Sequence, residues 1–228
     1  MIVVVVGTGT DVGKTHVTCA LLRAAVDAGL AARGWKPLAS GARGPFGDDA
    51  LAHAEAARAA PIAPGHVFEP PVSPHLAARA AGVDVSIPAL VDRARALAGS
   101  LDLLLVETAG GLFSPVTDAH ANDELVRALA PTAVLLVAPD RLGVLHDVAA
   151  TRLAGRARQV EVSATVLSAP PAPDASTGTN AAELASSAGV DVVAVFPRAA
   201  PVRPTSLAAA QATLAALGVS LIHTIPNI

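Results

Sequence analysis

The stretch Gly7-Thr8-Gly9-Thr10-Asp11-Val12-Gly13-Lys14-Thr15 decides the fold of this 228-residue chain. It follows an apolar run at positions 2–6, which predicts a buried strand, and it precedes Val17, Leu21 and Val26 at helical spacing. A glycine-rich turn between a strand and a helix is the setting of a phosphate-binding loop. Its glycines let backbone N–H groups converge on phosphate oxygens, and the helix N-terminus favours negative charge. The stretch therefore predicts a nucleotide-binding protein.

The side chains of this loop also suit a nucleoside triphosphate. Lys14 is expected to reach the β- and γ-phosphates as a point charge, and the Thr15 hydroxyl to ligate Mg²⁺. The pattern G-x-x-x-x-G-K-[ST] asks for its first glycine at position 8, where this chain has Thr8 and places Gly7 one position earlier. The residues expected to bind the nucleotide are Gly9, Thr10, Asp11, Val12, Gly13, Lys14 and Thr15.

Composition and charge argue against several other classes of function. Aromatic residues make up 2% of the chain and Tyr is absent, which disfavours a platform for stacking nucleic-acid bases. The net charge is −3 and no run of Lys or Arg occurs, so we expect no nucleic-acid partner. No apolar segment approaches the roughly 18 residues that span a membrane. Met1 leads straight into strand residues without a basic segment, so we expect a cytoplasmic protein that contacts no membrane.

Apolar strand-like runs alternate with helical stretches along the chain. Strands are predicted at 2–6, 30–35, 101–106, 133–138, 160–167, 190–195 and 220–223, and helices at 14–28, 49–59, 74–81, 87–98, 121–129, 144–156, 178–188 and 205–216. The alternation predicts an α/β fold of the P-loop NTPase type, a mostly parallel β-sheet with helices on both faces. We expect one nucleotide-binding domain over residues 1–228.

Polar residues that follow the predicted strands are the candidates for chemistry, because ligands of such sheets bind outside the carboxyl ends of the strands. Lys36 leaves the strand at 30–35, where it is either a solvated charge or a ligand contact. Asp49 opens a helix, either complementing its dipole or supplying a carboxylate to Mg²⁺. Glu107 follows the strand at 101–106, the position of an acidic residue that holds the metal or its water shell.

Several longer motifs occur in a fixed order over roughly positions 1 to 150. Besides the phosphate loop they are Lys36-Pro37-Leu38-Ala39-Ser40-Gly41, Asp49-Ala50-Leu51-Ala52, Phe68-Glu69-Pro70-Pro71-Val72-Ser73-Pro74-His75, Glu107-Thr108-Ala109-Gly110-Gly111-Leu112-Phe113-Ser114-Pro115 and Leu142-Gly143-Val144-Leu145-His146. Together, their order and spacing resemble the dethiobiotin synthetase family of the biotin pathway. The displaced glycine of the phosphate loop also fits the pattern of that family.

The resemblance implies an ATP- and Mg²⁺-dependent carboxylation and ring closure. The substrates would be 7,8-diaminononanoate, CO₂ or bicarbonate, and a nucleoside triphosphate. One amine captures CO₂ as a carbamate, the carbamate oxygen takes the γ-phosphoryl group, and the second amine closes the ureido ring and expels phosphate. Since carbamate and phosphoryl group are both anionic, Lys14 and Lys36 are expected to stabilise the charge between them.

The resemblance also assigns roles residue by residue. Thr10 and Asp11 join Lys14 and Lys36 as the catalytic set, because they match loop positions that face the nucleotide and the diamine. The metal ligands would be Thr15, Asp49 and Glu107, with Glu107 and Ser168 also counted at the nucleotide. The residues assigned to the substrate are Lys36, Ser40, Thr108, Ala109, Gly110, Gly143, Val144 and His146. The family is a homodimer in which segment 142–146 reaches the substrate carboxylate across the interface, so the resemblance implies a dimer here.

Three positions depart from the family pattern. Thr108 stands where the family commonly has glycine, and its Cβ restricts the backbone approach to substrate. His146 replaces the usual asparagine of the carboxylate-binding segment, and a histidine can also donate a hydrogen bond. Ser168 stands near the position where many members place an adenine-reading asparagine, and serine lacks the paired donor and acceptor of an amide. The preferred base is therefore open.

Three rival functions remain beside the synthetase interpretation. Another ligase of the same nucleotide-binding class, or a small kinase, would share the loop, although no Arg-rich lid of a kinase occurs. A partitioning-type ATPase would carry a lysine five residues before Lys14, where this chain has Gly9. A paralogue with the same fold and a different substrate, or none, would explain Thr108 and His146.

Overall fold

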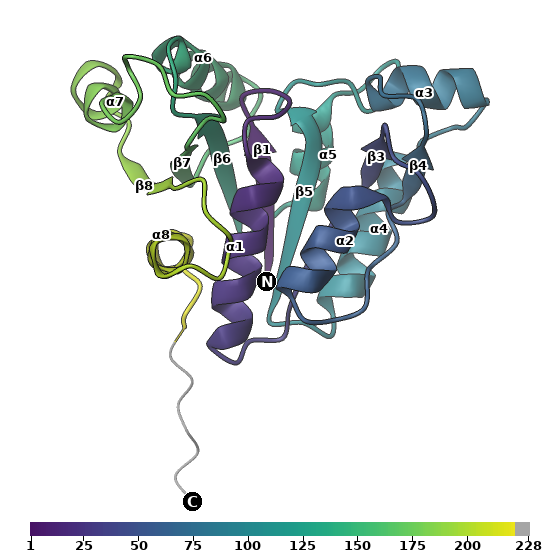
Figure 1. Cartoon of the computed structure of the whole chain (residues 1–228). Coiled ribbons are helices and arrows are strands. Elements are labelled where there is room, and N and C mark those ends of the chain that lie inside the picture. The colour runs from purple at the N-terminus through teal and green to yellow at the C-terminus, as the bar shows by residue number, and fades with distance from the viewer. Residues whose placement is uncertain (222–228) are drawn as a thin grey trace, which may run out of the picture.

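The computed structural model describes residues 1–221 (Figure 1). Its strands are β1 (Ile2–Gly7), β2 (Ala32–Trp35), β3 (Leu38–Ser40), β4 (His66–Phe68), β5 (Leu103–Gly111), β6 (Ala133–Pro139), β7 (Ala164–Ser168) and β8 (Val192–Phe196). Its helices are α1 (Lys14–Asp27), α2 (Gly47–Ala56), α3 (Pro74–Ala81), α4 (Ile87–Ala98), α5 (Asn122–Leu129), α6 (Val144–Ala157), α7 (Asn180–Ala188) and α8 (Pro204–Ala216).

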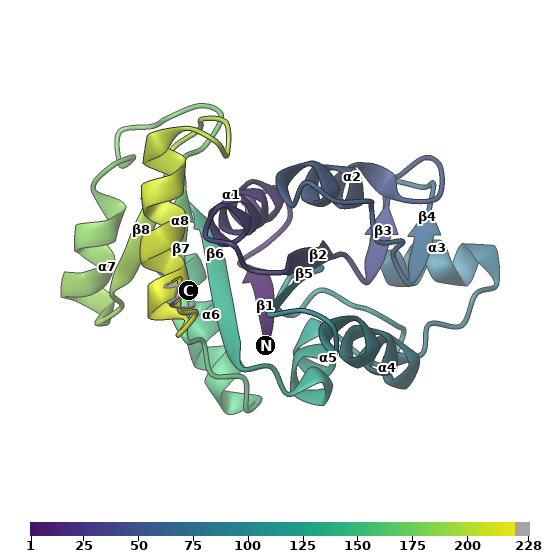
Figure 2. The same cartoon turned by 90° about the horizontal axis from the view of Figure 1, so that it is seen from below.

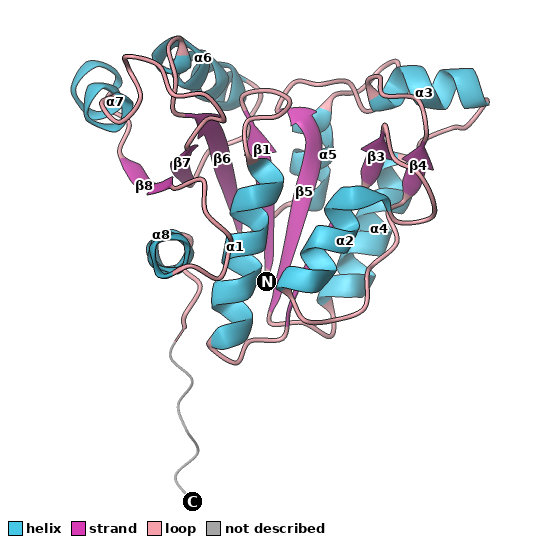
Figure 3. Ribbon diagram, viewed as in Figure 1, coloured by secondary structure: helices cyan, strands magenta, loops and turns pink. Residues whose placement is uncertain are grey.

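Six strands form one parallel sheet in the order β2-β5-β1-β6-β7-β8. Because β1 lies in the middle, the loop that follows it opens at the centre of the carboxyl edge of the sheet (Figure 3). The short strands β3 and β4 form a second parallel pair beside this edge. The topology therefore brings the ends of β1, β2 and β5 together, where Lys14, Lys36 and Glu107 were predicted to act.

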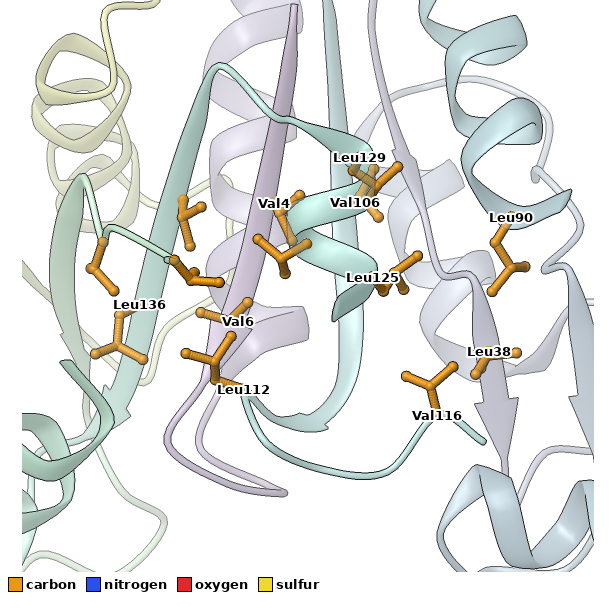
Figure 4. Packing of buried hydrophobic residues seen from close by; sticks show 14 of the residues in the cluster. Val4, Val6, Leu38, Leu90, Val106, Leu112, Val116, Leu125, Leu129 and Leu136 are labelled. Carbon is orange, nitrogen blue, oxygen red and sulfur yellow. The ribbon is translucent and has the colours of Figure 1, made fainter. Parts of the chain in front are cut away.

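Helices cover both faces of the main sheet, as Figure 2 shows from below. On one face Val3 and Val5 of β1 pack with Leu21 of α1 and Leu214 of α8. On the other face the alternate residues of β1 and β5 pack against α5, and Figure 4 shows Val4 and Val106 near Leu125 and Leu129. Full burial of a side chain of this size contributes about 1.5–3 kcal/mol. Both faces being covered explains why the strands are continuous apolar runs instead of alternating ones.

The structure confirms the predicted fold class, an α/β architecture with a parallel sheet between helices. Each of the eight predicted helices is present, with ends that differ by at most three residues. Among residues 1–221, no helix has both the length and the apolar character that crossing a bilayer requires.

Four details of the predicted strands were wrong or lie beyond the described chain. The strands β3 and β4 were not predicted, because three residues are too few to show a period. The strand β5 continues to Gly111, so Glu107 lies inside it and not after it. The strand β7 begins at Ala164 and not at position 160. In the predicted strand 220–223, positions 220 and 221 are not in a strand and the others lie outside the described residues.

Candidate functional site

The phosphate-type loop runs from the end of β1 at Gly7 to the start of α1 at Lys14. A Cβ on Gly7 would lie 2.9 Å from the Gly9 carbonyl oxygen and 2.8 Å from the Val12 side chain. The loop thus folds back over Gly7, which explains why the glycine stands one position earlier than the common pattern. Gly13 precedes the helix with φ +96°, a conformation that L side chains rarely adopt.

The Lys14 side chain crosses back over the loop. Its Nζ donates a hydrogen bond to the Gly9 carbonyl oxygen at 2.8 Å. Burial and the nearby Lys36 cation lower the pKa of Lys14 to about 8, although Glu107 and Asp49 oppose this shift. The lysine is thus held inside the loop, with its ammonium available to an anion entering it.

Thr15, Asp49 and Glu107 come together from α1, α2 and β5. The Thr15 Oγ1 lies 2.7 Å from Asp49 Oδ1 and 2.8 Å from Glu107 Oε1. A hydroxyl has one proton and can donate it to only one of the two oxygens at a time. The hydroxyl oxygen and the two carboxylate oxygens therefore lie close together, and the hydroxyl proton can bridge only one of the two short contacts. A cation at this place would stabilise the arrangement.

Lys36 supplies the positive charge next to these oxygens. Its Nζ lies 2.7 Å from Asp49 Oδ2 and 2.8 Å from Glu107 Oε1. Burial alone would lower the pKa of Lys36, but the two carboxylates outweigh it and raise the pKa above its usual value. Burial would likewise raise the pKa of Glu107, yet Lys36 and the hydrogen bond from His53 hold it well below the usual range. Lys36 and Glu107 are therefore both charged at neutral pH.

Two adjoining pockets open above this cluster. Eleven residues of the first were predicted as site residues: Thr10, Asp11, Gly13, Lys14, Thr15, Lys36, Ser40, Asp49, Glu107, Ala109 and Gly110. The second pocket shares Thr10, Asp11 and Gly13 with the first and adds Val12 and Ser168. Ser168 contacts the loop closely, because a Cβ on Gly13 would lie 2.3 Å from its Oγ. One chain thus brings together most of the residues that were predicted to bind nucleotide, metal and substrate.

Five predicted residues do not line these two pockets. Gly9 lies within the phosphate loop, where its carbonyl oxygen accepts the hydrogen bond from Lys14. Thr108 is buried, and its hydroxyl donates a hydrogen bond to the Val5 carbonyl oxygen at 3.3 Å, pointing away from the ligand edge. Gly143, Val144 and His146 lie at the start of α6, where His146 is exposed. The contacts of these residues with substrate stay predictions. The start of α6 was expected to reach the substrate bound to the other chain of a dimer.

Comparison with known proteins identifies the family. The AAA domain family matches residues 2–206. An ATP-dependent dethiobiotin synthetase of Anaeromyxobacter dehalogenans (strain 2CP-C) is 40% identical over 198 residues, which cover 85% of this chain and 88% of the relative. Another, from Caulobacter sp. (strain K31), is 41% identical over 172 residues, covering 72% and 74%. The chain belongs to the dethiobiotin synthetase family. The motif resemblance is confirmed, and with it the predicted class of enzyme, an ATP-dependent ligase of biotin biosynthesis.

Solved structures show the same fold at much lower identity. The MinD cell division protein of Aquifex aeolicus superposes with a TM-score of 0.57 at 12% identity, covering 100% of this chain and 99% of that chain. A ParA family ATPase of Chlorobium tepidum TLS gives a TM-score of 0.56 at 10% identity, covering 96% and 93%. These likenesses concern the fold, whereas membership of the synthetase family comes from the sequence relatives.

Sequence reasoning missed several residues of the candidate site. His53 contacts Glu107 from α2, and its spacing of four residues after Asp49 was a usable signal. Asn122 Nδ2 donates to the carbonyl oxygens of Ala109 at 2.7 Å and Gly111 at 2.8 Å, which holds the end of β5 beside the pocket. Arg198 lines both pockets from the segment after β8, and no motif marked it.

The oxygen donors fit Mg²⁺ better than a softer metal. In residues 1–221, no group of three or more His, Cys, Asp or Glu side chains is arranged to hold a metal ion by itself. Mg²⁺ needs no such cage, because it keeps several waters and is usually bound through one or two carboxylates together with substrate phosphates. A hydroxyl and two carboxylates beside a phosphate-binding loop meet that requirement.

Proposed function

We propose that this chain converts 7,8-diaminononanoate, CO₂ and ATP into dethiobiotin, ADP and phosphate. The observation that carries the proposal is the cluster of Lys14, Lys36, Thr15, Asp49 and Glu107 at one edge of the sheet, in a chain of the dethiobiotin synthetase family. Two fixed cations beside a phosphate loop suit a reaction whose intermediates are all anions.

The reaction has three steps. One amine of the substrate adds to CO₂ and loses a proton, which gives a carbamate. A carbamate oxygen attacks the γ-phosphorus and ADP leaves, and the second amine then attacks the carbamoyl carbon and expels phosphate. Lys14 and Lys36 stabilise the oxygens that carry charge, and Lys36 acts as a cation and not as a base because its pKa is raised. Positioning supplies the rate, without a covalent enzyme intermediate.

Mg²⁺ would be held by Thr15, Asp49 and Glu107 and would supply charge neutralisation at the phosphates. Thr10, Asp11 and Val12 bind the nucleotide with Gly9 and Gly13, and Ser168 lies in the pocket expected for the base. Ser40, Ala109 and Gly110 face the diamine from β3 and β5. The chain works as one nucleotide-binding domain in the cytoplasm.

The active assembly is a homodimer in this proposal. Gly143, Val144 and His146 lie outside the pockets of their own chain, at a helix start whose N–H groups suit an anion. A partner chain would bring this helix start to the substrate carboxylate. Leu142 beside it is 75% exposed, and such an apolar side chain suits an interface.

The test mixes purified protein with Mg²⁺, bicarbonate, 7,8-diaminononanoate and each nucleoside triphosphate in turn, and follows phosphate release and product mass. We expect diamine-dependent phosphate and a cyclic urea product, both abolished by Lys36→Ala. The ranking of the triphosphates then reports what Ser168 does to base preference. Nucleotide binding without diamine-dependent phosphate release would contradict the proposal and favour a paralogue with another substrate.

A further inference from the structure

His53 lies behind the acidic cluster without lining either pocket. It stands four residues after Asp49 on α2, so both side chains project from the same face of the helix toward β5. Its Nε2 lies 2.8 Å from Glu107 Oε2, and both side chains are almost completely buried. The helix that supplies one carboxylate of the cluster thus also supplies a contact to the other.

The two carboxylate oxygens of Glu107 have different partners. The Oε2 accepts from His53, whereas the Oε1 lies 2.8 Å from both Lys36 Nζ and Thr15 Oγ1. Without a donor at Oε2, the carboxylate could rotate about its terminal torsion, which is intrinsically soft. The histidine therefore fixes the orientation of the carboxylate plane, so that one oxygen is directed toward Lys36 and Thr15.

Among the described residues, the contact to Glu107 is the one hydrogen bond of the His53 side chain. Its Nδ1 is buried and has no hydrogen-bond partner within residues 1–221. Leaving a buried polar atom unpaired costs about as much free energy as one hydrogen bond returns. An apolar side chain of similar size would avoid that cost but would leave the buried Glu107 Oε2 without its donor, so the histidine serves the Glu107 carboxylate.

Gly34 makes room for the histidine ring. It lies in the middle of β2, and a Cβ there would lie 2.8 Å from His53 Cγ and 2.9 Å from His53 Nδ1. Its φ lies outside the left-handed region, so space and not backbone conformation requires the glycine. Glycine weakens a strand interior and often marks a close approach of this kind.

We propose that His53 is a positioning residue that orients Glu107 toward the metal and the phosphates, with Gly34 giving its ring the space to do so. Ligating carboxylates are commonly held by such hydrogen bonds, and losing one typically costs about 10- to 100-fold in metal affinity or activity. The inference rests on the proposed function, because it assumes that Glu107 serves a Mg²⁺–nucleotide site.

The experiment measures ATP affinity by calorimetry without diamine, once with Mg²⁺ and once with EDTA. The dissociation constant in EDTA divided by that in Mg²⁺, called the ratio below, reports how strongly the metal contributes to binding. In His53→Leu we expect this ratio to fall about 10-fold, while the metal-free dissociation constant stays within about threefold. A ratio equal to that of the parent would overturn the proposal, and this includes the case in which affinity falls by the same factor in both conditions.

Conservative variants separate positioning from packing. His53→Gln carries an amide donor near the place of Nε2 and should restore the ratio, whereas His53→Asn is too short and should not. This comparison also decides the question if His53→Leu fails to fold, and equal ratios for Gln and Asn would refute the proposal. As a matched control, His120→Leu removes a histidine that pairs with Glu124 on the surface, and it should leave the ratio unchanged.

Gly34→Ala provides an independent variant. It should lower the ratio in the parent background but have little further effect in His53→Gly, because neither the ring nor the His53 Cβ, itself 2.9 Å from the new Cβ, remains to be displaced. Additive effects would contradict the role given to Gly34. A parent that binds ATP more tightly with Mg²⁺ but makes no dethiobiotin would refute the proposed function alone, and the His53 ratios would still decide this inference.

Discussion

Lys36 and Asp49 form an ion pair across the mouth of the site, with Nζ 2.7 Å from Oδ2. The lysine side chain is 8% exposed and the aspartate side chain 35%, so the pair closes the cluster on its solvent side. The same ammonium contacts buried Glu107. One cation thus contacts both carboxylates, which are also the groups proposed to hold Mg²⁺.

Lys36→Met should remove turnover more than nucleotide binding. We expect kcat to fall about 10²–10³-fold, the usual cost of losing one preorganised charge at a reacting group. The melting temperature should also fall, because Glu107 then keeps a buried charge without its main partner. Steady-state kinetics, ATP calorimetry and thermal unfolding measure the three quantities. A kcat within threefold of the parent would show that Lys36 has no part in the chemistry.

Gly13→Ala should destabilise the protein more than Gly143→Ala, although the two glycines have nearly equal φ, +96° and +95°. Both substitutions bear the strain of a left-handed alanine, about 1–3 kcal/mol. At Gly13 the new Cβ would meet Ser168, whereas at Gly143 no atom of the described residues lies within 4 Å of it. Denaturant unfolding gives the difference, and Ser168→Gly should remove much of it. Equal losses for the two alanines would contradict the close contact of Ser168 with the loop.

Mixing two inactive variants should restore activity if the proposed dimer is correct. Lys36→Ala removes a group of the pocket, and His146→Glu places a negative charge at the helix start that would face the substrate carboxylate. A mixed dimer then contains one intact site, so an equal mixture should recover about a quarter of the parent activity after subunit exchange. No recovery, with mixed dimers shown by mass spectrometry, would place His146 in the site of its own chain.

Asp174→Asn should weaken the loop before α7 in a pH-dependent way. Asp174 accepts hydrogen bonds from the Ser176 hydroxyl and from the backbone N–H of Leu142, and these contacts lower its pKa to about 2. Because the folded-state pKa lies below the ordinary value of 3.8, the carboxylate stabilises the fold above about pH 4. That contribution is lost as the pH falls toward 2. The difference in unfolding free energy between parent and variant should therefore shrink over this range, and a constant difference would contradict the assignment.

Those parts of the site could be predicted from sequence in which the residues that determine the geometry are neighbours in the chain. The strand, the glycine-rich turn and the helix at 2–28 are contiguous, so local pattern was enough to place Lys14 and Thr15. The motifs around Lys36, Asp49 and Glu107 pointed to the edge of the sheet because parallel strands present their carboxyl ends together. Their side chains do meet there.

What the sequence by itself determined is the α/β fold, the phosphate loop and the family, because each depends on periodicity or on motifs read along the chain. Only the tertiary structure decided that the Thr108 side chain turns into the core, that Ser168 packs on Gly13, and that His53 reaches Glu107 past Gly34. These contacts join residues of separate elements up to 155 positions apart, as for Gly13 and Ser168. Their geometry depends on how the helices pack on the sheet, and no local pattern in the sequence records that packing.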